Sequence, residues 1–174
     1  MVQEAYRNYE PPRWVRPTVE RLLAAVPAVQ LGTLQAIVLT NAAAVGAGRT
    51  RRVKGRKYDR RECRGFYHHK HPGSAASIDI VVDNVVAGYP PFLLVFRLFR
   101  DDVVADVLFH ELGHHLDATI GAAAPSGEAA AEDWSRRLWR SYFGRRYWWL
   151  RPIAKVLTPP VRWILRRRRM RKRR

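Results

Sequence analysis

The chain has 174 residues, 47% of them hydrophobic, and a formal net charge of +17. This length and composition suit one compact domain with a hydrophobic core and additional segments. The single cysteine, Cys63, excludes an intramolecular disulfide, and the first residues lack the charged-then-apolar pattern of a secretory signal. We therefore expect a cytoplasmic protein.

Charge is distributed unevenly along the chain. All 15 acidic residues precede Trp134, whereas half of the 32 lysines and arginines lie from Trp134 onward. This asymmetry predicts a near-neutral domain over residues 1–144 and a basic, aromatic C-terminal extension over residues 145–174.

The long uncharged stretch from Leu22 to Gly48 contains Pro27, several glycines and several polar residues. This composition argues against a membrane-spanning helix. Instead, the pattern predicts a helix over Thr18–Val26 and a strand over Leu34–Thr40. A basic hairpin is expected within Arg49–Arg64, with its turn at Val53–Arg56.

The run from Ser77 to Val82 is rich in β-branched residues and alternates in part, which predicts a strand ending at Asp83 and Asn84. The apolar run Phe92–Phe99 follows two prolines, and this slightly favours a helix there. Asp101 and Asp102 are expected to cap a further helix that continues to Leu116.

After that helix, Gly121–Gly127 has the composition of a loop, and Ser126 is a candidate N-cap for a second helix beginning near Glu128. The apolar positions of this second helix predict a face that packs inward, formed by Ala131, Trp134, Leu138 and Tyr142.

The segment His110-Glu111-Leu112-Gly113-His114 matches the H-E-x-x-H pattern. Histidines four positions apart lie on one face of a helix, so both imidazoles can bind one zinc ion. Glu111 lies about 100° round the helix from His110, where it can reach a water on that zinc rather than the zinc itself. The pattern therefore predicts a zinc site with Glu111 as the catalytic base.

A catalytic zinc site requires a third protein ligand and an open position. Asp117 lies on nearly the same helical face, but its short side chain starts one turn beyond His114. Glu128 opens the following helix, and the intervening loop is long enough for that helix to fold back. Glu128 is therefore the preferred third ligand, and Asp117 is the alternative.

The motif at 110–114, followed by Glu128-Ala129-Ala130-Ala131-Glu132-Asp133-Trp134, resembles the gluzincin group of zincin metallopeptidases, and the small minigluzincins are the most similar in size. The resemblance implies that His110, His114 and Glu128 bind zinc and that Glu111 acts as the base. It also implies that Glu132, where the family usually has Asp, accepts a hydrogen bond from His110 and so orients its ring. The implied fold is an α+β, zincin-like single domain with a small mixed sheet, a motif-bearing helix and a following Glu-bearing helix.

The function implied is hydrolysis of peptide bonds in a peptide or protein substrate. In zincins an extended substrate pairs with an edge strand, and the candidate strand in this chain is the one that carries Ile78, Ile80 and Val82. An alternative from a different class is a basic nucleic-acid-binding protein whose zinc is structural or regulatory.

The C-terminal extension has clumped aromatic residues, such as Tyr147-Trp148-Trp149, among many arginines. This composition suits a peripheral anchor on an anionic membrane surface, here the inner face of the membrane, and also a nucleic-acid-binding segment. Clumping of the aromatics favours the membrane slightly, and both partners remain open.

Overall fold

The computed structural model describes residues 1–45, 50–53, 56–120 and 127–150. The chain divides into two compact units, Met1–Trp139 and Arg140–Arg174. The first unit contains a sheet, most of the helices and every candidate ligand. In the second unit, the described residues are the end of the last long helix and a short 3-10 turn, and the rings of Tyr142, Phe143 and Tyr147 contact one another there.

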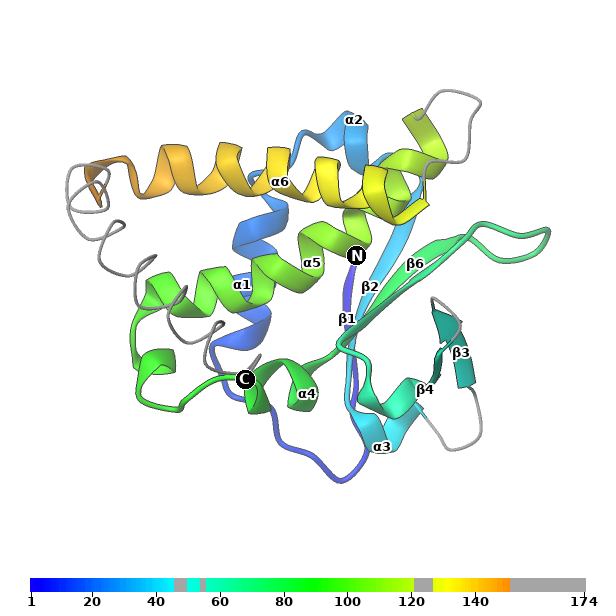
Figure 1. Cartoon of the computed structure of the whole chain (residues 1–174), viewed down its shortest axis with the longest axis horizontal. Helices are drawn as coiled ribbons and strands as arrows, with labels where there is room; N and C mark the ends of the chain where they lie inside the picture. Colours follow the sequence, from blue (N-terminus) through cyan, green and yellow to red (C-terminus); the bar gives the residue numbers. More distant parts are fainter. Residues whose placement is uncertain (46–49, 54–55, 121–126, 151–174) are drawn as a thin grey trace, which may run out of the picture. The chain divides into compact units, whose positions relative to one another are not determined.

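A four-stranded mixed sheet is the framework of the first unit (Figure 1). Its order is β1-β2-β6-β5, comprising β1 (Val2–Ala5), β2 (Leu34–Thr40), β6 (Ala76–Val81) and β5 (Gly65–His68). The first three strands are parallel, and β5 is antiparallel to β6. The predicted α+β class with a small mixed sheet is therefore confirmed.

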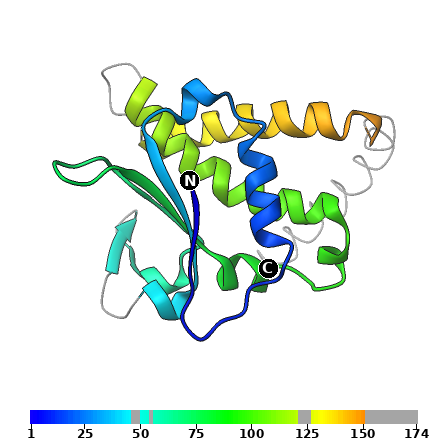
Figure 2. The same cartoon turned by 180° about the vertical axis from the view of Figure 1, so that it is seen from behind.

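Two helices pack together beside this sheet. They are α1 (Val15–Leu23) and α5 (Arg97–Ile120), which contact each other, as the view from behind also shows (Figure 2). Their buried side chains are mainly branched aliphatics, including Val19, Leu22, Leu108 and Leu112, which form the core with Ile37, Leu39, Ile78 and Ile80 of the sheet. Burial of these apolar faces stabilises the position of α5 on the sheet.

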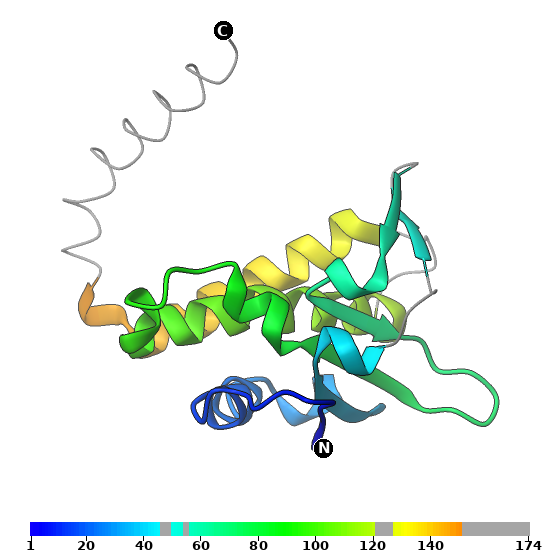
Figure 3. The same cartoon turned by 90° about the horizontal axis from the view of Figure 1, so that it is seen from below.

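The third long helix, α6 (Gly127–Arg146), begins where the sequence placed it, next to Glu128. Its N-terminal half lies along α5, on a different side of α5 from α1 (Figure 3). Of the positions expected to face inward, Ala131 and Leu138 are buried and Trp134 is partly exposed. The expected loop and its Ser126 cap lie outside the described residues.

Shorter elements connect this framework. They are α2 (Ala28–Leu31), α3 (Ala42–Val45), the hairpin strands β3 (Thr50–Val53) and β4 (Arg56–Asp59), η1 (Arg60–Glu62), α4 (Val82–Ala87), η2 (Leu93–Val95) and η3 (Trp148–Leu150). The predicted basic hairpin is confirmed by the antiparallel pairing of β3 with β4, and residues 54 and 55 of its turn lie outside the described ranges.

Among the helices in the described ranges, none combines the length and apolarity that crossing a membrane requires.

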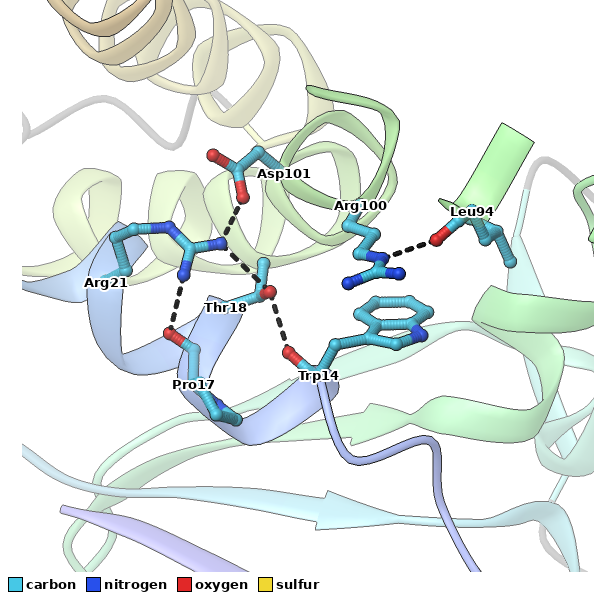
Figure 4. A network of polar contacts seen from close by, with 7 residues as sticks. All are labelled: Trp14, Pro17, Thr18, Arg21, Leu94, Arg100 and Asp101. Atoms are coloured by element: carbon cyan, nitrogen blue, oxygen red, sulfur yellow. Dashed lines mark hydrogen bonds and ion pairs between the residues drawn. The ribbon is translucent and has the colours of Figure 1, made fainter. Parts of the chain in front are cut away.

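One expectation about a helix boundary is wrong. Asp101 and Asp102 do not cap α5, because the helix already begins at Arg97 and both aspartates lie within it. Asp101 is fully buried and accepts a hydrogen bond from Arg21 of α1 (Figure 4). Asp83 and Asn84 follow the end of β6 closely, as expected, and belong to α4, which begins at Val82.

Candidate metal centre

The two histidines of the motif lie on the C-terminal half of α5, as their spacing predicts. Their rings are nearly perpendicular, with centroids 4.9 Å apart, and both side chains are partly buried. The opposite face of this part of α5 carries the buried Leu108, Leu112 and Leu116. The core therefore fixes the rotation of the helix and leaves His110 and His114 pointing away from it.

Glu128 completes a three-residue group with these histidines. One carboxylate oxygen, Oε2, lies 3.4 Å from His110 Nε2 and 3.8 Å from His114 Nε2. Ligand atoms of the three residues lie within 4.8 Å of one another. In a tetrahedral zinc site with bonds of about 2.0–2.1 Å, ligand atoms are about 3.3–3.4 Å apart. The two separations from Glu128 Oε2 are close to this value, so the two imidazoles and the carboxylate form a group that could hold a metal ion.

The second nitrogen of His110 faces another acid of α6. Glu132 Oε2 lies 3.8 Å from His110 Nδ1, while Nε2 of the same ring faces Glu128. A carboxylate on the distal nitrogen is the usual partner of a metal-binding imidazole, because it fixes the tautomer and the orientation of the ring. Glu132 therefore lies near the ring nitrogen on which its implied orienting role depends, at an ion-pair separation that is longer than a hydrogen bond.

Glu111 is buried against strand β5. A Cβ atom at Gly65 would lie 2.9 Å from both Cγ and Oε1 of Glu111 and 2.7 Å from Val107 Cγ1. Since real Cβ atoms do not approach so closely, any side chain at position 65 would displace the Glu111 carboxylate. Gly65 is thus a residue that positions Glu111, and sequence reasoning did not identify it.

Gly113, inside the motif, allows the close approach of α6. A Cβ atom at this position would lie 2.2 Å from the backbone oxygen of Ala131. Ala131 lies between Glu128 and Glu132 and is itself fully buried, so this contact sets the distance between α5 and both acids. The glycine was visible in the motif, but its role becomes apparent only when the two helices are seen together.

His115 anchors the other side of the motif. It is fully buried, with Nδ1 3.2 Å from the Tyr67 hydroxyl and Nε2 3.4 Å from Thr33 Oγ1. Burial lowers the pKa of His115 and raises the pKa of Tyr67, so both groups are neutral at physiological pH. These contacts tie α5 to β5 and to the loop before β2.

An open cleft of about 610 Å³ borders the centre. His110, Glu111 and Glu132 line it together with residues of η1, of the segment leading into β5 and of α6, among them Cys63, Arg64, Gly65, Ser135 and Trp139. The candidate base and one candidate ligand therefore face a space that is large enough for a peptide segment.

Two predicted site assignments differ from this geometry. Within the described ranges, the only group close enough to hold a metal ion contains Glu128, and Asp117 does not belong to it. The strand with Ile78 and Ile80 is not an edge strand, because β6 pairs with β2 on one side and β5 on the other. Ile78, Ile80 and Val82 are buried, and Val82 belongs to α4. The strand at this end of the sheet is β5.

Comparison with known proteins found no matching family model, no matching curated protein and no matching solved structure.

Proposed function

We propose that this chain is a zinc-dependent peptidase with a zincin-like fold, in which His110, His114 and Glu128 bind the metal and Glu111 is the general base. The observation that carries the proposal is the convergence of two histidines from α5 and one carboxylate from α6. The adjoining cleft adds support, because a structural zinc site is normally closed by four protein ligands.

The chemistry follows from the residues around that group. A bound zinc ion supplies Lewis acidity, which makes water acidic near neutral pH and polarises a carbonyl. Glu111 accepts the proton of the attacking water and later donates it to the leaving amine. Gly65 leaves the space that the Glu111 carboxylate occupies, and Glu132 orients the His110 ring. No covalent bond between the enzyme and its substrate is required.

Strand β5 replaces the interior strand as the candidate for binding the substrate main chain. It lies at the end of the sheet, and Arg64 and Gly65 at its start line the cleft. An extended peptide can pair with the outer edge of such a strand, which would bring a peptide bond towards Glu111.

The experiment that tests the proposal is Glu111→Gln in the full chain, assayed with a peptide library by mass spectrometry. The amide preserves the shape but cannot accept a proton, so we expect zinc content and fold to be retained and cleavage to fall by about 10²- to 10⁴-fold. Glu62→Gln is the matched control, because Glu62 lines the same cleft and has no role in the proposed chemistry.

Equal cleavage by the wild type and Glu111→Gln would show that Glu111 is not the base. Zinc binding without any cleavage, together with salt-sensitive binding to DNA or RNA, would instead establish the nucleic-acid-binding alternative.

A further inference from the structure

The turn η2 presents three large apolar side chains to solvent. Phe92, Val95 and Phe96 are exposed to 68%, 67% and 60%, respectively, whereas Leu94 between them is buried. Isolated exposed apolar residues are ordinary, but three neighbours on one short turn form a patch of the kind that marks an interaction site. We refer to Phe92, Val95 and Phe96 as the η2 tip.

A network of polar contacts holds this turn in place (Figure 4). Arg100 Nε donates a hydrogen bond to the carbonyl oxygen of Leu94, and the Arg100 guanidinium lies 5.5 Å from the centroid of the Trp14 ring. About two turns further along α1, Arg21 donates to the Asp101 carboxylate of α5. These contacts fix the backbone that carries the η2 tip. Binding of a partner to the tip therefore costs little conformational entropy.

The charges near the η2 tip indicate the kind of partner. No acidic residue occurs between Asp83 and Asp101, and the tip is followed by Arg97, which is exposed, and by Arg100. Exposed aromatic and aliphatic side chains beside the exposed Arg97 match the interface of an anionic bilayer, where apolar groups enter the acyl boundary and the arginine meets the headgroups.

We propose that the η2 tip inserts into the interface of an anionic lipid membrane and docks the first unit on its surface. This inference is independent of the peptidase proposal, because it uses no residue of the metal centre. It also differs from an anchor formed by the C-terminal extension, because it places a contact on the folded unit itself.

The test uses the full chain with Cys63→Ser, so that a new cysteine is the only attachment site for an environment-sensitive fluorophore. The label is placed at Phe92→Cys or, as a matched control, at Val29→Cys, since Val29 is 84% exposed but lies on α2. On vesicles of phosphatidylcholine and phosphatidylserine we expect a blue shift and quenching by brominated lipids at position 92 only.

A second variant checks the energetic contribution. Changing Phe92, Val95 and Phe96 together to Ser should lower the partition coefficient onto these vesicles by at least about tenfold, because several buried methylene equivalents are lost. Val29→Ser should leave the partition coefficient unchanged. Circular dichroism of each variant verifies that the fold is retained.

Three results would overturn the proposal. The first is a label at position 92 that stays in water while the chain is bound, which would assign the binding to the C-terminal extension alone. The second is a label that is shielded before vesicles are added, which would mean that another segment of the chain covers the tip. The third is a lack of vesicle binding, which would leave a protein partner as the occupant.

Discussion

The two halves of α5 carry ionisable side chains in contrasting situations. In the N-terminal half, Asp101 pairs with Arg21, and Asp102 accepts a hydrogen bond from Trp139 Nε1. Burial raises the pKa of Asp102, an effect that the Trp139 hydrogen bond partly offsets. In the C-terminal half, His110 and His114 instead face carboxylates of α6 beside a cleft.

The contrast distinguishes a candidate site from a structural contact on the same helix. In the N-terminal half, each acid has a complementary donor from a neighbouring element, and such pairs hold helices together. In the C-terminal half, His110 and His114 converge with Glu128 of α6 on one point. That convergence, rather than burial or charge alone, is what indicates a metal ion.

The largest effect is expected at the structural end of the helix. Arg21→Ala should lower the free energy of unfolding by about 3 kcal/mol, because it removes the cationic partner of the fully buried Asp101 carboxylate. Chemical denaturation of the zinc-free protein measures this loss. Under native conditions the variant should still bind zinc with the affinity of the wild type.

The double variant Arg21→Met with Asp101→Leu serves as its control. Replacing both charges with apolar side chains of similar volume should restore most of the lost stability. A large drop in the zinc affinity of the folded Arg21→Ala protein would contradict the separation of the two halves.

A smaller effect that combines stability and function is expected at Gly113. Gly113→Ala should destabilise the protein by about 2 kcal/mol, because the added methyl group meets the backbone of Ala131, although alanine is the better helix former by about 1 kcal/mol. Zinc affinity, measured by competition with a chromophoric chelator, should fall as well, because α6 carries Glu128 and Glu132 away from the histidines.

Gly32→Ala is the matched control, since a Cβ atom there would meet only Val29 O at 3.6 Å, an ordinary contact. If Gly113→Ala were instead stabilising, with zinc affinity unchanged, the close approach of α5 and α6 would not be needed for the metal centre.

The smallest of these effects is expected at Glu132. Glu132→Ala should weaken zinc binding by about tenfold, the lower end of the range for outer partners of metal-binding histidines, because the carboxylate is exposed and 3.8 Å from His110 Nδ1. Asp133→Ala removes the same charge at the next position, where the carboxylate contacts Arg136 instead. Equal zinc affinities in the two variants would show that Glu132 affects zinc binding only through its negative charge and not through its position beside His110.

Features that depend on neighbours in the sequence were predicted well. Strand β2 covers Leu34–Thr40 as expected, and the i, i+4 spacing places His110 and His114 together because helix geometry alone decides it. Glu128 was preferred because the loop before it is long enough for the next helix to fold back, and the resemblance to gluzincins implied the same residue. The structure brings its carboxylate to the histidines.

Features that depend on distant segments were not predicted. Aspartate is a preferred N-cap residue, so Asp101 and Asp102 indicated the start of a helix. In the structure α5 already begins at Arg97. The β-branched run ending at Val82 looks the same whether its strand is central or at an edge, and the pairing with β5 decides this. The roles of Gly65 and Gly113 depend on contacts with Glu111 and Ala131 that no local pattern encodes.

The measurement that tests the metal centre most directly is a competitive zinc titration of the wild type, Glu128→Ala and Asp117→Ala. We expect one zinc ion per wild-type chain. Glu128→Ala should lose more zinc affinity than the about 10–100-fold that is typical when a residue hydrogen-bonded to a metal ligand is removed. Asp117→Ala should bind zinc almost as tightly as the wild type. Wild-type affinity in Glu128→Ala, or a wild-type chain that binds no zinc, would contradict the assignment of His110, His114 and Glu128 as a metal site.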